Sequence, residues 1–164
     1  MDSDHDALPA ATGRLKTEAT VPGLLRASAR TFTEVLDARA CTISRVIGDL
    51  LVDLIQHNQD PDATRLGHGY LISDYPLTRA VIEGPEPQTV FAEDPKADAN
   101  ELALLRELGF DALLMVALDG EDGAWGLVEV YDDKGRSFSA EDVALAGELA
   151  REIGSLLRGL ERPA

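Results

Sequence analysis

Apolar residues recur at helical spacing near the start of the chain. In residues 22–38, Leu25, Ala29, Phe32 and Leu36 follow one another every three or four positions. This period predicts an amphipathic helix with one buried face.

A second helical pattern occupies the last part of the chain, from about residue 140. Ser139 followed by Asp142 is typical of a capping box at a helix start. The apolar positions then repeat in a short heptad pattern, at Ala146, Leu149, Ile153, Leu156 and Leu160. We therefore predict a long amphipathic helix at each end of the domain.

Four segments between these helices predict two β-hairpins. Residues 40–47 and 50–57 are rich in β-branched residues and are separated by the Gly48-Asp49 turn. Residues 112–118 and 125–131 flank an acidic, glycine-rich turn. The run 112–118 contains no polar residue, so we expect that strand to be covered on both faces.

Shorter elements complete the pattern. Residues 74–83 predict a short helix with Asp74 as its N-cap, residues 88–91 a short strand, and residues 99–108 a helix that ends at Gly109. The acidic segment 1–20 has few large apolar residues and predicts a mobile tail.

Taken together, the elements predict a single domain over residues 21–164 of the mixed α/β (α+β) class. A central sheet of five to six strands would carry the two long terminal helices on one face. The short helices and loops would cover the other face.

Composition narrows the possible partners. Fifteen basic and 30 acidic residues give a net charge of −15, which disfavours nucleic acid and anionic membranes as partners. No window approaches the roughly 18 apolar residues of a membrane span. The N-terminus lacks the apolar core of a signal peptide, so we expect a cytoplasmic protein.

The sequence lacks the residues that metal binding and the common kinds of catalysis require. Cys41 is the only cysteine, and His5, His57 and His68 do not show metal-ligand spacing. No serine–histidine–acid set, phosphate loop or dinucleotide motif is present. We therefore predict no metal site, no catalytic residue and no identifiable cofactor.

Three stretches together resemble the GAF domain family, a group of small-molecule-sensing domains related to PAS. They are YPLTRAVIEGPEPQTVF, the late strand GLVEVYDD, and its continuation RSFSAEDVALAGELAREIGSLL. The resemblance implies an antiparallel sheet with a ligand pocket between the sheet and the short helices. Relatives that attach a bilin need a cysteine in a pocket helix or loop, and this chain has none there.

Strand alternation places Trp125, Leu127, Glu129 and Tyr131 on one face, which suits a pocket wall. The Glu129 carboxylate either accepts hydrogen bonds from a ligand or pairs with Arg45 of the first strand. Arg45 in turn either binds an anionic ligand group or serves as that ion-pair partner.

Three more candidates lie in the segment that would roof the pocket. Tyr70, Tyr75 and Arg79 either stack on and clamp a planar ligand or simply anchor the roof by packing.

Small residues on the last helix suggest a close approach by another surface. Gly147 and Gly154 stand a heptad apart, and glycine costs about 1 kcal/mol inside a helix. A parallel helix bundle in a homodimer, or helix packing within one chain, would explain them. The candidate interface residues are Leu25, Phe32, Gly147, Ala150, Gly154 and Leu157.

The sequence thus favours a non-enzymatic sensory domain that signals through its terminal helices in a dimer, to a further domain or a partner protein. Two alternatives stay open. One is a dimerisation scaffold whose pocket is filled by side chains. The other is an enzyme that uses Arg45, Glu129 and Tyr75.

Overall fold

The computed structural model describes residues 3–60, 69–84 and 86–162. Its elements, in chain order, are α1 (Ser3–Leu15), α2 (Val21–Leu36), β1 (Ala40–Ile47), β2 (Leu50–Asn58), β3 (Gly69–Leu71), a 3-10 turn η2 (Ile72–Asp74), α3 (Pro76–Glu83), β4 (Gln88–Phe91), α4 (Ala99–Glu107), β5 (Ala112–Gly120), β6 (Gly123–Asp132) and α5 (Ala140–Glu161).

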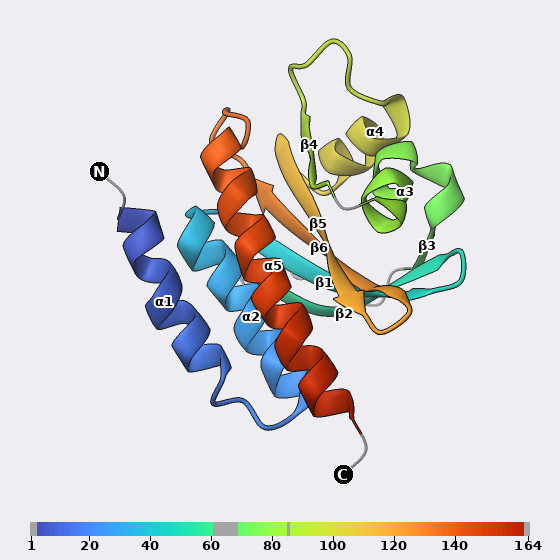
Figure 1. Cartoon of the computed structure of the whole chain (residues 1–164). Coiled ribbons are helices and arrows are strands. Elements are labelled where there is room, and N and C mark those ends of the chain that lie inside the picture. Colours follow the sequence, from blue (N-terminus) through green and yellow to red (C-terminus); the bar gives the residue numbers. More distant parts are fainter. Residues whose placement is uncertain (1–2, 61–68, 85, 163–164) are drawn as a thin grey trace.

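The strands of the described chain form one sheet in the order β3-β2-β1-β6-β5-β4, with every neighbouring pair antiparallel. Helices α1, α2 and α5 form a layer on one face, and α3 and α4 lie over the other (Figure 1). We call these the helix face and the lid face. The predicted fold class and its division of long and short helices between the two faces are confirmed.

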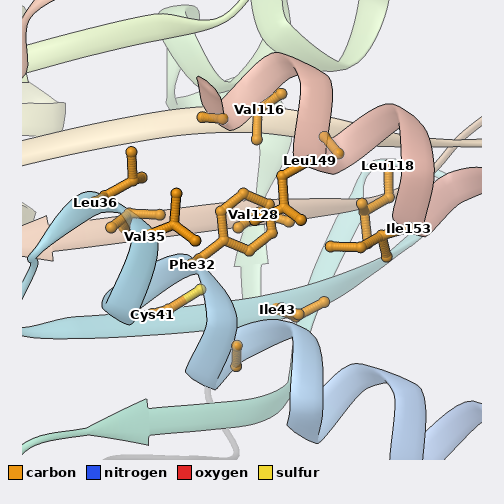
Figure 2. Packing of buried hydrophobic residues seen from close by; sticks show 14 of the residues in the cluster. Phe32, Val35, Leu36, Cys41, Ile43, Val116, Leu118, Val128, Leu149 and Ile153 are labelled. Carbon is orange, nitrogen blue, oxygen red and sulfur yellow. The ribbon is translucent and has the colours of Figure 1, made fainter. Parts of the chain in front are cut away.

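The larger apolar core lies on the helix face. Phe32 of α2 and Leu149 and Ile153 of α5 meet the strand residues Ile43 and Val128, and all five side chains are fully buried (Figure 2). A side chain of this size contributes about 1.5–3 kcal/mol when it leaves water. This core therefore supplies most of the apolar stabilisation of the fold.

Strand β5 explains the uninterrupted apolar run in the sequence. Leu114, Val116 and Leu118 join the helix-face core, whereas Leu113 and Met115 join a smaller core under α3 and α4. Successive side chains of a strand point to opposite faces. Both faces of β5 are therefore dry, as its sequence predicts.

A β-bulge interrupts the alternation of β6 at Trp125. Leu118 pairs with Gly126, but the next residue of β5, Asp119, pairs with Ala124, so Trp125 is an extra residue in its strand. A bulge changes the face on which the preceding residues lie. Trp125 accordingly packs in the helix-face core, whereas Leu127 and Tyr131 lie on the lid face.

The predicted mobile tail over residues 1–20 is wrong for residues 3–15, which form α1. Ala11 and Leu15 are both 1% exposed, and Leu8 packs against the same core. Leu8, Ala11 and Leu15 follow helical spacing, but they are only three residues and one of them is an alanine. The acidic composition around them hides this weak pattern.

Most of the predicted dimer-interface residues are instead part of the core within one chain. Leu25, Phe32, Ala150 and Leu157 are at most 3% exposed, because α2 and α5 pack against each other and against the sheet. A Cβ atom on Gly154 would lie 3.2 Å from the backbone oxygen of Asp119 in β5. Of the two glycines among the predicted interface residues, Gly147 is the one that faces open space, since nothing lies within 4 Å of a Cβ atom built on it.

A substitution at Gly126 tests the close approach of β6 to β1. A Cβ atom at this position would lie 2.3 Å from the backbone oxygen of Ser44, so we expect Gly126→Ala to lower the free energy of unfolding by about 1–3 kcal/mol or more. Gly147→Ala is the matched control and should raise it by about 0.5–1 kcal/mol, because it has space and better helix propensity. Urea denaturation measures both, and an unchanged Gly126→Ala stability would contradict this packing.

Candidate ligand-binding site

The centre of the lid face carries a buried carboxyl group, that of Glu129 on β6. Its side chain is 6% exposed, and the Tyr131 hydroxyl donates a hydrogen bond of 2.9 Å to Glu129 Oε2. The two residues are two positions apart on one strand, so they share a face. Glu129 is thus held on the lid side of the sheet, as its sequence position predicts.

The surroundings of Glu129 favour its protonated form. Burial raises the pKa of Glu129 to about 8, and the negative charges of Asp53 and Glu101 act in the same direction, while the hydrogen bond from Tyr131 opposes them. A carboxyl group with this pKa holds its proton at neutral pH. It can therefore both donate and accept hydrogen bonds toward the pocket.

Tyr131, the hydrogen-bond partner of Glu129, lines a small cavity of about 20 Å³, and Glu129 itself is not among its lining residues. Since a water molecule needs about 10–15 Å³ of such space, the cavity has room for about one. Polar and aromatic side chains from both the sheet and the loop before β5 surround it: Thr42, Asp53, Gln56, Tyr70, Leu108, Phe110 and Tyr131.

Aromatic rings form the walls of this cavity. The rings of Phe110 and Tyr131 stack at 5.1 Å, and those of Tyr70 and Tyr75 meet edge to face at 6.0 Å. On the strand side, the Ser44 hydroxyl donates a hydrogen bond of 2.7 Å to the Asp53 carboxylate. The site therefore combines flat apolar surfaces with a few oriented polar groups, as small-molecule sites generally do.

A second buried carboxylate, Glu101 of α4, lies at 2% exposure under the lid. Its Oε1 accepts hydrogen bonds of 3.0 Å from both the backbone N–H and the hydroxyl of Thr78 in α3. Burial raises the pKa of Glu101, whereas these hydrogen bonds lower it. Asp74, the predicted cap of α3, lies before the helix, and Tyr75 takes the N-cap position without a side-chain bond.

The predictions for Arg45 and Trp125 as pocket residues are wrong. The Arg45 guanidinium lies 4.4 Å from the centre of the Trp125 ring, and its Nη1 donates to the Trp125 backbone oxygen at 2.7 Å. Arg45 shares its strand face with Ile43, which is the helix face, and the bulge brings Trp125 to the same side. The alternative ion pair between Arg45 and Glu129 is therefore absent.

The roof residues fall into two groups. Tyr70 lines the cavity and Tyr75 contacts Tyr70, so both lie at the site. Arg79 is on the outer side of α3, where it is exposed and pairs with Glu83 at 2.9 Å. Its predicted role in clamping a ligand is not supported by this position. His68 lies outside the described residues.

Sequence reasoning missed several residues of the site. In the sequence, Asp53 looks like a solvent-facing polar residue of a strand, and Glu101 looks like an ordinary surface residue in the first turn of a helix. Thr42 and Phe110 carry no signal of their own. Strand pairing brings Thr42 to the site, since it lies directly opposite Glu129 in the sheet.

Two further features of the described chain bear on the class of site. In the part of the chain that the structure describes, no group of three or more His, Cys, Asp or Glu side chains could hold a metal ion. Among the same residues, no helix is long and apolar enough to cross a membrane.

The chain belongs to the GAF domain family, whose pattern matches residues 21–157. This match covers α2, every described strand and most of α5. A search of curated protein sequences finds no match.

Solved structures with the same fold include phytochromes. A bacteriophytochrome from the photosynthetic bacterium R. palustris superposes with a TM-score of 0.85 at 14% identity, over 98% of this chain and 39% of that one. The photosensory core module of the Stigmatella aurantiaca phytochrome gives 0.81 at 17% identity, over 97% and 37%. This chain thus spans well under half the length of either protein.

A third structure has nearly the same extent as this chain. It is a far-red absorbing dark state with bound biliverdin IXa, with a TM-score of 0.82 at 14% identity, covering 95% of this chain and 99% of that one. At such identities the likeness establishes the fold alone.

The buried Glu129 carboxyl predicts a pH-dependent stability. Because its pKa rises from 4.5 to about 8 on folding, the folded state binds more protons than the unfolded state between these values. Stability should then fall as pH rises through this window, by on the order of a few kcal/mol from this group. Glu129→Gln should remove this component, so that wild type loses more stability than the variant between pH 5 and pH 9.

Urea denaturation at a series of pH values measures this difference. The variant serves as the reference for every other titrating group. Parallel curves for the two proteins would mean that Glu129 titrates at its ordinary pKa and is not buried as described.

Proposed function

We propose that this GAF domain is a non-enzymatic sensory domain that binds a small molecule on the lid face, next to Glu129. The observation that carries the proposal is the buried Glu129–Tyr131 pair beside a cavity with aromatic walls. Burying a polar group costs free energy unless the group forms a hydrogen bond with the protein or with a ligand. A carboxyl group with a pKa near neutrality is the kind of group that concentrates at functional sites.

The proposed site lies between the sheet and the short helices. One fold relative holds biliverdin IXa, but the cavity of about 20 Å³ in this protein is far smaller than such a ligand. The single cysteine, Cys41, is fully buried in the helix-face core and offers no attachment point on the lid side. Our proposed ligand is therefore a smaller molecule held without a covalent bond.

The non-enzymatic reading is supported by the residues around the cavity. Among the described lining residues there is no histidine, lysine or cysteine, so the pairing of a hydroxyl or thiol nucleophile with a histidine or lysine base is not assembled there. The carboxyl and phenol groups can orient a ligand through hydrogen bonds, which is sufficient for recognition.

Strand β6 offers a route from the site to the terminal helix. Glu129 lies four residues from Trp125, whose indole Nε1–H donates a hydrogen bond of 3.1 Å to Glu161 at the end of α5. A ligand that shifts β6 would change this contact and so bias the helix toward another arrangement. In our proposal this change is passed to a further domain or a partner protein.

We also propose that the domain forms a homodimer through the open surface at Gly147. A surface groove of about 490 Å³ runs between α5 and the edge of β5 there, and Val116, Val143 and Gly147 are among its lining residues. Gly147→Glu would place a charge in this groove without a clash, since nothing lies within 4 Å of a Cβ atom at that position.

The alternative of a scaffold with a filled pocket is favoured by one observation, the small size of the cavity. Leu105 and Met115 are fully buried under the lid and occupy much of the space there. A scaffold would dimerise as proposed but would bind no small molecule.

Native mass spectrometry of gently purified protein separates these functions. We expect a dimer of 17.6 kDa chains with a retained small molecule, and Gly147→Glu should give monomers of unchanged fold. A bare dimer that also binds nothing from a metabolite library would support the scaffold. A wild-type monomer would contradict the dimer proposal.

Trp125 provides an independent readout, because it is the only tryptophan of the chain. We expect binding at the Glu129 site to change its fluorescence, and Glu129→Gln to weaken both binding and the change. Binding that leaves the Trp125 emission unaltered would contradict the proposed route through β6.

A further inference from the structure

A ligand larger than a water molecule can enter the site only if one of its walls moves. Strands β1 and β6, which contribute Thr42 and Tyr131 to the cavity wall, are each paired on both sides within the sheet, so they cannot swing away from it. Leu108 and Phe110 of the same wall directly follow α4. Helices α3 and α4 lie over the lid face, side by side and away from the long helices (Figure 1). They pack on the smaller of the two cores, and elements with fewer buried apolar contacts open at lower free energy.

One buried carboxylate joins these two helices. Helix α3 begins at Pro76 without a side-chain cap from its own chain segment, which leaves the first N–H groups without intrahelical partners. Glu101 of α4 supplies the missing acceptor, since its Oε1 lies 3.0 Å from both the N and the Oγ1 of Thr78. The cap of α3 therefore comes from α4.

Further contacts fix the geometry of this joint. Asp98 caps α4 by accepting hydrogen bonds from the backbone N–H groups of Asn100 and Glu101, which holds Glu101 in place. The Asn100 side chain donates a hydrogen bond of 3.0 Å to the Asp74 backbone oxygen just before α3. Thr78 Oγ1 also lies 3.4 Å from the Met115 sulfur of β5, which seats the joint on the sheet.

We propose that α3 and α4 open and close as one lid over the site, and that the buried Glu101–Thr78 contact is the latch that joins them. If either helix moved alone, it would leave a buried carboxylate without donors and a helix N-terminus without an acceptor. Losing hydrogen bonds to a charged buried group is more costly than losing neutral ones. Movement of the pair keeps these bonds and breaks only contacts with the sheet.

The gating role of this lid rests on the proposed function, whereas the existence of a two-helix unit does not. Hydrogen–deuterium exchange on the protein without ligand therefore tests the unit by itself. In wild type, the amides of α3 and α4 should exchange through a common opening. This opening should be more frequent than that of α2, α5 and β5.

Thr78→Val removes the hydroxyl donor while keeping the side-chain shape. We expect exchange to rise on the order of tenfold in both α3 and α4, with α5 and β5 unchanged. Thr78→Ser keeps the hydroxyl and should restore the wild-type pattern. Thr31→Val is the matched control, because it removes a buried hydroxyl on α2 that bonds to the Ala27 backbone oxygen, and it should leave the lid unaffected.

Two outcomes would overturn the inference. Faster exchange in α3 with no change in α4 would show that the helices open separately. An equal rise in α3, α4, α5 and β5 would show that the contact stabilises only the whole fold. Either result leaves the proposed binding site standing, since that site is tested by native mass spectrometry.

Discussion

Coverage of the inner strands on both faces is the constraint that organises this domain. Strand β5 carries apolar side chains on both sides, and neither side can be left in water without losing the free energy of its burial. The chain meets this requirement with two different layers. Long helices at its two ends cover one face, and two short helices from its middle cover the other.

The two layers differ in what they bury. On the helix face, Phe32, Leu149 and Ile153 form a continuous apolar core (Figure 2). On the lid face, the carboxyl groups of Glu129 and Glu101 are buried among a smaller set of apolar residues. Burying these groups costs free energy that each recovers only through particular hydrogen bonds. The lid face therefore depends more on particular hydrogen bonds than the helix face does.

The fold follows from the sequence because it depends on strong periodic signals. Apolar residues at helical spacing predict α2 and α5, the capping box at Ser139 marks the start of α5, and the polar-free run predicts β5. The face of Glu129 is also predicted correctly, since no irregularity separates it from Tyr131. Helix α1 escapes this reasoning because its packed face consists of only three apolar residues, Leu8, Ala11 and Leu15, in an acidic segment.

The failures at the site arise where local geometry departs from a simple period. A single bulge residue moves Trp125 to the helix face, where Arg45 already lies by strand alternation and stacks on its ring. Gly154 of α5 lies close to the β5 backbone of the same chain, which leaves little room for a side chain. Its spacing from Gly147 therefore does not signal a partner. The role of Glu101 depends on a contact with Thr78, 23 residues away in the chain, and no local pattern encodes such a contact.

The central claim is that Glu129 is buried on the lid face, beside the cavity that its partner Tyr131 lines. Carbon-13 NMR of the glutamate side-chain carboxyl groups, assigned with Glu129→Gln, measures the titration of this group directly. The account predicts a midpoint for Glu129 of about 8. A midpoint near the ordinary value of 4.5 would show that the carboxyl group is in contact with water, and would contradict the account.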